Sequence, residues 1–123
     1  MILDAGALIA VAKNDRRMIA RLLAAHEEDE ELKTHPLVVA QAWRDGRRQA
    51  LLARLLRGTT IVSVDDELGR QAGELLGKAR TSDPIDAAVV LIARDGEAIV
   101  TSDEADLRHL ARAAKRRVIV VAC

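Results

Sequence analysis

The feature that most constrains the fold is a short apolar run, Met1 to Leu3, which ends abruptly at Asp4. An alanine-rich segment, Ala5 to Ala12, follows at once and predicts a helix. A buried strand that leads directly into a helix is typical of sheets whose strands are parallel. Asp4 is therefore expected at the carboxyl end of the first strand, the edge at which open α/β sheets bind their ligands.

Further apolar or β-branched runs alternate with amphipathic segments along the chain. They predict strands within residues 34–40, 59–64, 98–100 and 117–121. Helices are expected over the ranges 16–25, 41–43, 47–57, 65–80, 85–93 and 104–114. This order predicts a three-layer α/β/α sandwich with a central parallel sheet of about four or five strands. The range 1–123 is expected to form a single domain.

Composition narrows the functional classes. The 19 Lys and Arg residues balance the 19 Asp and Glu residues, so net charge gives no reason to expect nucleic-acid binding. Trp43 is the only Phe, Tyr or Trp residue, which argues against binding by base stacking. Cys123 is the only cysteine, so no intramolecular disulfide can form. No leader-like or membrane-spanning apolar run is present, and we expect a cytoplasmic protein that does not contact a membrane.

Acidic residues occur where predicted strands end or helices begin: Asp4, Asp83, Asp86, Asp103 and Asp106. Because the strand ends of a parallel sheet share one edge, these carboxylates are expected to converge. Converging carboxylates repel one another, and a divalent cation relieves that repulsion. Oxygen-only ligands suit Mg²⁺ or Mn²⁺. The sequence contains neither a Cys/His zinc spacing nor a glycine-rich phosphate-binding loop that would indicate another chemistry.

Each acid also has an alternative structural explanation. Asp83 precedes Pro84 and is well placed to cap the next helix, and Asp103 could cap the helix that follows it. Asp4 ends a strand and could cap the alanine-rich helix, whereas Asp86 lies on an otherwise apolar helix, where a charge needs a partner. The acidic run at residues 27–31 is interpreted as a solvated helix end or loop rather than a metal site.

Three motifs together resemble the PIN domain, and more narrowly the VapC-type ribonuclease toxins of toxin–antitoxin pairs. They are Ile2 to Leu8, Asp83 to Ala88, and Ile99 to Asp103 with Asp106. The resemblance implies a PIN-like α/β/α fold, an acidic site for Mg²⁺ or Mn²⁺, endonucleolytic cleavage of RNA, and neutralisation by a cognate antitoxin.

Carried over by position, the resemblance implies roles for individual residues. Asp4, Asp86 and Asp103 would be the catalytic acids and metal ligands, with Asp106 as a further ligand. Thr101 would support the site by hydrogen bonding, and Asp83 would also have a supporting role.

The sequence departs from the family's pattern at Gln41, where PIN toxins usually carry a glutamate. A glutamine offers a carbonyl oxygen but no charge. Metal affinity could then be weakened, or the chain could be an inactive module that binds an antitoxin or RNA without cleaving it. Asp45 lies beside Gly46 near a helix end and is not expected to replace the missing acid.

Two apolar helix faces have no catalytic explanation. One comprises Met18, Ile19, Leu22 and Leu23, and the other comprises Leu51, Leu52, Leu55 and Leu56. Such faces usually belong to the core. The resemblance implies a second use for Met18, Ile19, Leu22, Leu23, Leu51 and Leu55, as a surface for the antitoxin or for a homodimer.

Two other enzyme classes fit the sequence poorly. A response-regulator phosphoacceptor domain needs paired acids near the first strand, but the pair Asp65-Asp66 follows the third predicted strand instead. A haloacid-dehalogenase-like phosphatase needs Asp-x-Asp after the first strand, and Asp4-Ala5-Gly6 lacks the second acid.

Overall fold

A sheet of five parallel strands, in the order β3-β2-β1-β4-β5, forms the centre of the protein. The structure is a computed structural model that describes all residues from 1 to 123. The strands are β1 (Ile2–Leu3), β2 (Lys33–Thr34), β3 (Thr60–Ile61), β4 (Ala98–Thr101) and β5 (Ile119–Ala122). The parallel α/β sheet expected from the sequence is confirmed.

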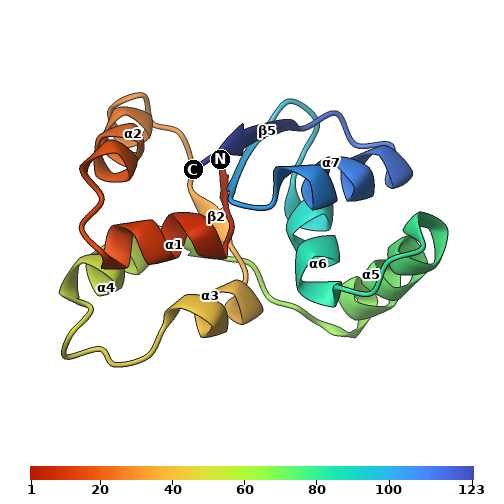
Figure 1. Ribbon diagram of the computed structural model, residues 1–123, viewed down its shortest axis with the longest axis horizontal. Helices are drawn as coiled ribbons and strands as arrows, with labels where there is room; N and C mark the ends of the chain where they lie inside the picture. The colour runs from red at the N-terminus through yellow and green to blue at the C-terminus, as the bar shows by residue number, and fades with distance from the viewer.

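Seven helices flank this sheet in two groups (Figure 1). Their bounds are α1 (Ala5–Ala12), α2 (Arg16–Glu27), α3 (Pro36–Ala42), α4 (Ala50–Arg57), α5 (Asp66–Ala79), α6 (Pro84–Ile92) and α7 (Glu104–Ala113). Helix α1 packs against α2, α3 and α4, whereas α5, α6 and α7 pack against one another. None of the seven has both the length and the apolar character needed to cross a membrane.

The centre of the sheet is the point where the chain changes direction. Strand β1 pairs with β2 on one side and with β4 on the other, so that Ile2 is level with both Lys33 and Ile99. The chain proceeds from β1 outward to β2 and β3, and it then returns to β4 and moves outward to β5. The carboxyl ends of β1 and β4 therefore flank a topological switch point, where α/β sheets form their ligand crevices.

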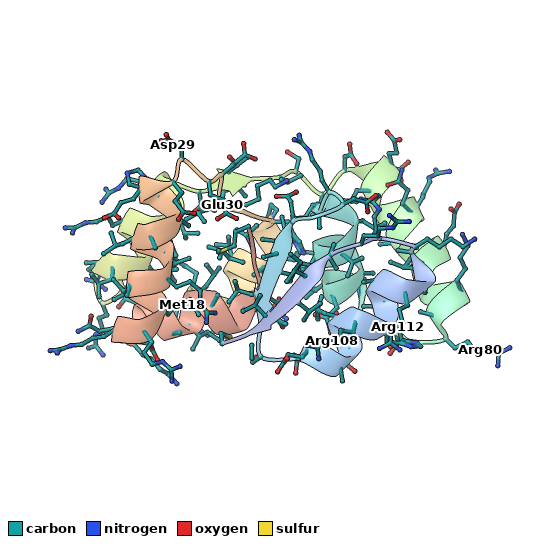
Figure 2. The ribbon with its side chains drawn as sticks, turned by 90° about the horizontal axis from the view of Figure 1, so that it is seen from above. Met18, Asp29, Glu30, Arg80, Arg108 and Arg112 are labelled. Carbon is teal, nitrogen blue, oxygen red and sulfur yellow. The ribbon has the colours of Figure 1, made fainter.

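Helix starts follow from short-range hydrogen bonds. Asp15 caps α2 by accepting from the Met18 amide at 2.9 Å, and Asp65 caps α5 by accepting from the Leu68 amide at 2.8 Å. The run of acids at residues 27–31 ends α2 and continues into an exposed loop. Figure 2 shows Asp29 at the outer tip of the turn, whereas the carboxylate of the next residue, Glu30, lies 3.3 Å from the α-amino group of Met1. The interpretation of this run as a solvated helix end is confirmed.

Two predicted elements are shorter than expected. The helix predicted from Arg47 begins only at Ala50, because the Gln49 side chain holds the preceding loop in a non-helical shape. Its oxygen accepts from the amides of Arg44 (2.8 Å) and Asp45 (3.1 Å), and its nitrogen donates to the Ala42 carbonyl at 2.9 Å. The strand predicted over 59–64 is reduced to Thr60–Ile61, which lies at the edge of the sheet and pairs only with β2.

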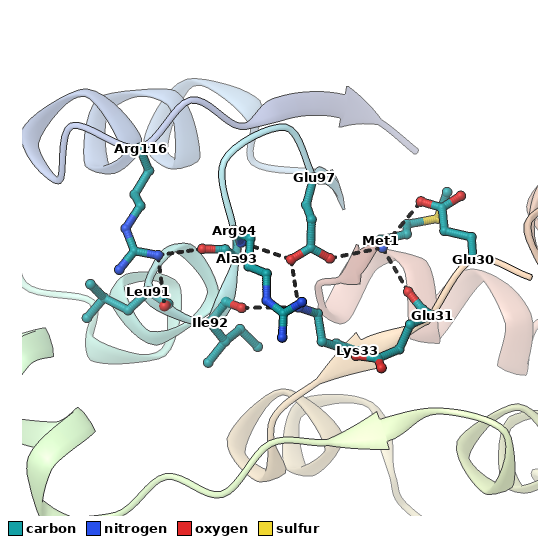
Figure 3. Close-up of polar contacts among 10 residues, drawn as sticks. All are labelled: Met1, Glu30, Glu31, Lys33, Leu91, Ile92, Ala93, Arg94, Glu97 and Arg116. Carbon is teal, nitrogen blue, oxygen red and sulfur yellow. Dashed lines mark hydrogen bonds and ion pairs between the residues drawn. The ribbon is translucent and has the colours of Figure 1, made fainter.

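A partly buried ionic network crosses the amino edge of the sheet (Figure 3). Lys33 of β2 is only 6% exposed, and its Nζ lies 2.6 Å from Glu97 Oε1. The other oxygen of Glu97 faces the α-amino group of Met1 at 3.4 Å, and the Arg94 amide donates to Oε1 at 2.9 Å. Burial by itself would raise the pKa of Glu97, but the Lys33 hydrogen bond and the other contacts outweigh it and lower that pKa.

Replacing Glu97 should therefore remove stability that depends on pH. Because its pKa is lowered on folding, Glu97 stabilises the protein above its ordinary pKa of 4.5 and loses that contribution as pH falls through the folded value. We expect Glu97→Gln to lower the free energy of unfolding at pH 7 by about 1.5–3 kcal/mol. Urea unfolding at pH 7 and pH 3 measures this difference, which should be smaller at pH 3. Glu28→Gln, at an exposed position, is the control; an equal loss in both variants would contradict the prediction.

Candidate active site

Asp4 is held at the carboxyl end of β1 with 4% of its surface exposed. Its amide donates to the Val100 carbonyl at 3.0 Å, which extends the pairing with β4 by one residue. Its Oδ2 accepts a 2.7 Å hydrogen bond from the Thr101 hydroxyl. Asp4 occupies the N-cap position of α1, but its side chain makes no capping bond. The alternative explanation of Asp4 as a side-chain cap is therefore wrong, because its Oδ2 is bonded to Thr101 and neither oxygen bonds an amide of α1.

Thr101 connects two of the predicted acids. It is fully buried, and its hydroxyl accepts from the Asp103 amide at 2.9 Å while it donates to Asp4. A threonine hydroxyl can donate once and accept at the same time, so one side chain ties the end of β1 to the turn after β4. Gly6 allows the start of α1 to approach this turn, because a Cβ there would lie 2.7 Å from Ser102 Oγ.

Asp83 and Asp86 come from the start of α6 and have different roles. Asp83 Oδ1 accepts from the amides of Ile85 (2.9 Å) and Asp86 (3.2 Å), so its interpretation as a helix cap is confirmed. Asp86 lies in the first turn of α6 with 8% of its surface exposed, and buried apolar residues follow it. Its side chain makes no hydrogen bond within the protein, unlike that of Asp83.

Asp103 and Asp106 are exposed residues at the start of α7. Asp103 occupies the N-cap position but does not cap the helix, which corrects the alternative explanation of this residue. Its backbone (φ −115°, ψ 57°) lies outside the extended region from which N-cap side chains reach the helix amides. Both carboxylates are thus free of hydrogen bonds within the protein and can rotate.

The pKa of Asp86 responds to the charges of the other predicted acids. Its pKa rises from 3.8 to about 7. Burial is the largest cause, and the negative charges of Asp83, Asp4, Asp103 and Asp106 follow in that order. Three segments that are distant in sequence, the end of β1, the start of α6 and the turn from β4 into α7, therefore act on one carboxyl group.

The chemistry of these donors fits a hard divalent cation, because they are carboxylates that repel one another in a partly buried site. As the side chains stand, no group of three or more His, Cys, Asp or Glu residues is gathered closely enough to hold a metal ion. A cation here would therefore require the exposed Asp103 or Asp106 to turn toward Asp4 and Asp86.

Two neighbouring residues that the sequence did not single out also support the site. Thr34 and His35 are both fully buried at the end of β2. The Thr34 hydroxyl donates to the Leu3 carbonyl at 2.8 Å, and His35 Nε2 lies 3.1 Å from the Ile85 carbonyl. Burial lowers the pKa of His35, against the opposing effects of the Ile85 hydrogen bond and the Asp4 charge. The only sequence signal was a histidine placed directly before the proline that begins a helix.

Gln41 is separate from this network. It is exposed on α3, and no hydrogen bond joins its side chain to Asp4, Asp86 or Asp103. Asp45 is also occupied elsewhere, because its carboxylate accepts from the Arg47 amide at 3.0 Å. Neither side chain adds a ligand to the acidic group in this structure.

The two apolar faces predicted from the sequence meet in a single groove between α1, α2 and α4. Its volume is about 420 Å³, and Ile19, Leu22, Leu23, Leu51 and Leu55 contribute to its lining. Leu23 is 58% exposed and Leu51 is 38% exposed, so two large apolar side chains face solvent there. Met18, which the sequence pattern groups with them, is 5% exposed, belongs to the core and does not line the groove. Leu52 is fully buried and also belongs to the core.

Comparison with known proteins identifies the fold. The chain is similar to a chain in the crystal structure of VapBC2 from Rickettsia felis bound to a DNA fragment from their promoter. The TM-score is 0.67 and the sequence identity is 14%, with 99% of this chain and 97% of that chain covered. No protein-family model and no curated protein match the sequence. This chain has a PIN-like fold.

Asp86 should lower the stability of the metal-free protein as pH rises, whereas Glu97 should raise it. The pKa of Asp86 is raised on folding, so the folded state binds the proton more tightly, and stability falls as pH rises from about 4 to 7. Asp86→Asn should reduce this fall by about 2–4 kcal/mol, as expected for a shift of roughly three units at 1.36 kcal/mol each.

Urea unfolding in the presence of a chelator, repeated between pH 4 and pH 8, measures the effect. Asp29→Asn is the matched control, because Asp29 is exposed and has a positive φ of 55° that asparagine tolerates. Parallel stability curves for the wild type and Asp86→Asn would contradict the assignment.

Proposed function

We propose that this protein is a Mg²⁺- or Mn²⁺-dependent endoribonuclease that acts as the toxin of a toxin–antitoxin pair. The observation that carries the proposal is the position of Asp4 and Asp86, both nearly buried at the switch point of the sheet, where the charges of Asp103 and Asp106 also act on Asp86. Like charges are costly at such a position, so their presence favours a function over a structural role. The PIN-like fold and the order of the three sequence motifs support the same reading.

The ligands proposed for the cation are Asp4, Asp86 and Asp103, with Asp106 as a further candidate. Thr101 occupies Asp4 Oδ2, while Asp4 Oδ1 and both oxygens of Asp86 have no partner within the protein. No buried side-chain oxygen lacks a hydrogen bond, so these unpartnered oxygens are within reach of solvent and of a ligand. A divalent cation bound by such oxygens orients a water molecule and stabilises the leaving oxygen in phosphodiester cleavage.

The remaining residues of the site would hold these ligands in place. Thr101 fixes the rotation of the Asp4 carboxylate through the 2.7 Å hydrogen bond. Asp83 fixes the first turn of α6, from which Asp86 projects, by accepting from the amides of Ile85 and Asp86. Second-layer contacts of this kind tune metal affinity and catalytic rate.

The proposed partner is a cognate antitoxin with an apolar segment that lies in the groove between α2 and α4. Leu23 and Leu51 expose apolar surface there, and Arg54 at its edge offers a positive charge to an acidic flank of the partner. The structural neighbour from Rickettsia felis is a VapBC2 complex, which is consistent with a partner of this kind. We also propose that the protein forms a homodimer through a helix face outside this groove.

A second candidate function follows from Gln41 and from the absence of a ready three-ligand site. The chain could bind an antitoxin or RNA through the same fold without cleaving RNA. The two functions differ in two observations: a nuclease both inhibits growth when it is produced without its partner and cleaves RNA as the purified protein.

The nuclease proposal is tested by replacing Asp4. We expect the purified protein to cleave RNA in the presence of Mn²⁺ or Mg²⁺, and a chelator to stop the reaction. Asp4→Asn should reduce cleavage by at least about 100-fold, since the site loses a charged ligand while the asparagine oxygen can still accept from Thr101. Asp29→Asn serves as the control at an exposed acid. Wild-type cleavage or growth arrest by Asp4→Asn would refute the proposal.

The partner surface is tested at Leu23. Because this side chain is 58% exposed, Leu23→Asp should leave stability nearly unchanged while it introduces a charge into the groove. We expect at least about a tenfold loss of affinity for the product of an adjacent small open reading frame, measured by calorimetry, as for other central apolar contacts. Leu37→Asp, at a 43% exposed leucine outside the groove, is the matched control. Equal affinities for both variants would place the partner elsewhere.

A further inference from the structure

The last residue of β2, Thr34, and the residue after it, His35, each form a hydrogen bond with a backbone carbonyl. In both cases the carbonyl belongs to the residue directly before a buried acid. Thr34 Oγ1 donates to the carbonyl of Leu3, the residue before Asp4, at 2.8 Å. His35 Nε2 lies 3.1 Å from the carbonyl of Ile85, the residue before Asp86. The turn between β2 and α3 thus contacts both β1 and α6, which belong to different layers of the fold.

The hydrogen bonds of His35 define a single tautomer. The Leu37 amide can only donate, so Nδ1 accepts a hydrogen bond from it, with 3.2 Å between the two nitrogens. The Ile85 carbonyl can only accept, so Nε2 must carry the ring proton and donate it. The imidazole therefore performs two tasks at once: it caps α3 through Nδ1, and it anchors the start of α6 through Nε2–H.

The anchored carbonyls control the position of the acids because peptide groups are planar. The Ile85 carbonyl belongs to the same rigid peptide unit as the Asp86 amide and Cα, and the Leu3 carbonyl has the same relation to Asp4. Asp4 and Asp86 repel each other, so their distance depends on contacts that resist separation. Thr34 and His35 are fully buried side chains; the Thr34 hydrogen bond is buried as well, whereas the His35 bond reaches the half-buried Ile85 carbonyl and is only partly shielded from water.

We propose that Thr34 and His35 are positioning residues that set the separation of Asp4 and Asp86. This inference rests on the proposed function insofar as that separation governs RNA cleavage. Displacing catalytic groups by about 1 Å can lower a rate on the order of 100-fold, which gives these two side chains influence over the reaction without contact with the substrate.

Two substitutions separate the tasks of His35. In His35→Asn the amide oxygen takes the place of Nδ1, so the cap of α3 is kept while the donor to Ile85 is lost. In His35→Gln the amide nitrogen takes the place of Nε2, so the donor is kept while the cap is lost. We expect His35→Asn to reduce kcat on the order of 100-fold with little change in KM, and His35→Gln to retain most of kcat. Thermal midpoints should rank the variants in the reverse order, because His35→Asn keeps the helix cap.

Thr34 provides a matched second pair. Thr34→Ser keeps the hydroxyl, whereas Thr34→Val has nearly the same shape and lacks it. We expect kcat to fall in Thr34→Val and to be restored in Thr34→Ser. A purely structural role would make kcat follow the thermal midpoint across all four variants, and that result, or full activity of His35→Asn, would overturn the inference.

A readout that needs no activity distinguishes this inference from the proposed function. The ¹³C resonance of the Ile85 carbonyl and the ¹⁵N resonance of the Asp86 amide should shift in His35→Asn and remain near their wild-type values in His35→Gln. If the wild type cleaves no RNA with Mn²⁺ or Mg²⁺, the proposed function fails, and these resonances still decide whether His35 anchors the peptide group that precedes Asp86. Equal resonances in both variants would overturn the inference.

Discussion

Repulsion between carboxylates at the centre of the sheet is the constraint on which the rest of this structure depends. Asp4 and Asp86 are almost completely buried, and the charges of Asp83, Asp4, Asp103 and Asp106 add to burial in raising the pKa of Asp86 to about 7. Such an arrangement lowers stability, so it persists only where neighbouring contacts hold it. Thr101 binds the Asp4 carboxylate, Asp83 caps the helix that carries Asp86, and Thr34 and His35 hold the main chain before both acids.

The two edges of the sheet have opposite electrostatics. At the amino edge, Lys33 and Glu97 neutralise each other at 2.6 Å, and the pKa of Glu97 is lowered. At the carboxyl edge, acids gather without a basic partner, and the pKa of Asp86 is raised. Strand β2 contributes to both, because Lys33 begins it and Thr34 ends it. The repulsive edge is the one at which we propose that a cation binds, while the paired edge contributes stability.

The groove between α1, α2 and α4 is a second place where the structure keeps an unfavourable feature, in this case apolar side chains exposed to water. Leu23 and Leu51 remain exposed beside buried neighbours such as Leu22 and Leu52. These exposed leucines are the reason we propose this groove as the partner surface. Its lining comes from the helices on the α1 side of the sheet, whereas Asp86 and Asp103 come from the other helix group. The β1–α1 unit connects the two regions, since Asp4 precedes α1 and Val11 of α1 lines the groove.

Much of the local structure was determined by the sequence itself. The helix Ala5–Ala12, the cap at Asp83 and the apolar strand from Ala98 were all predictable, because capping bonds and apolar periodicity act over a few residues.

Only the tertiary structure decided which acids cap helices and which do not. Asp4 and Asp103 stand at N-cap positions like Asp83, yet their environment is set by Thr101, which is distant in sequence from Asp4. The same is true of Lys33, Thr34 and His35, whose partners lie in β1, α6 and the turn before β4. Local sequence patterns carry no information about hydrogen bonds between residues distant in sequence, because these residues meet only once the sheet has assembled.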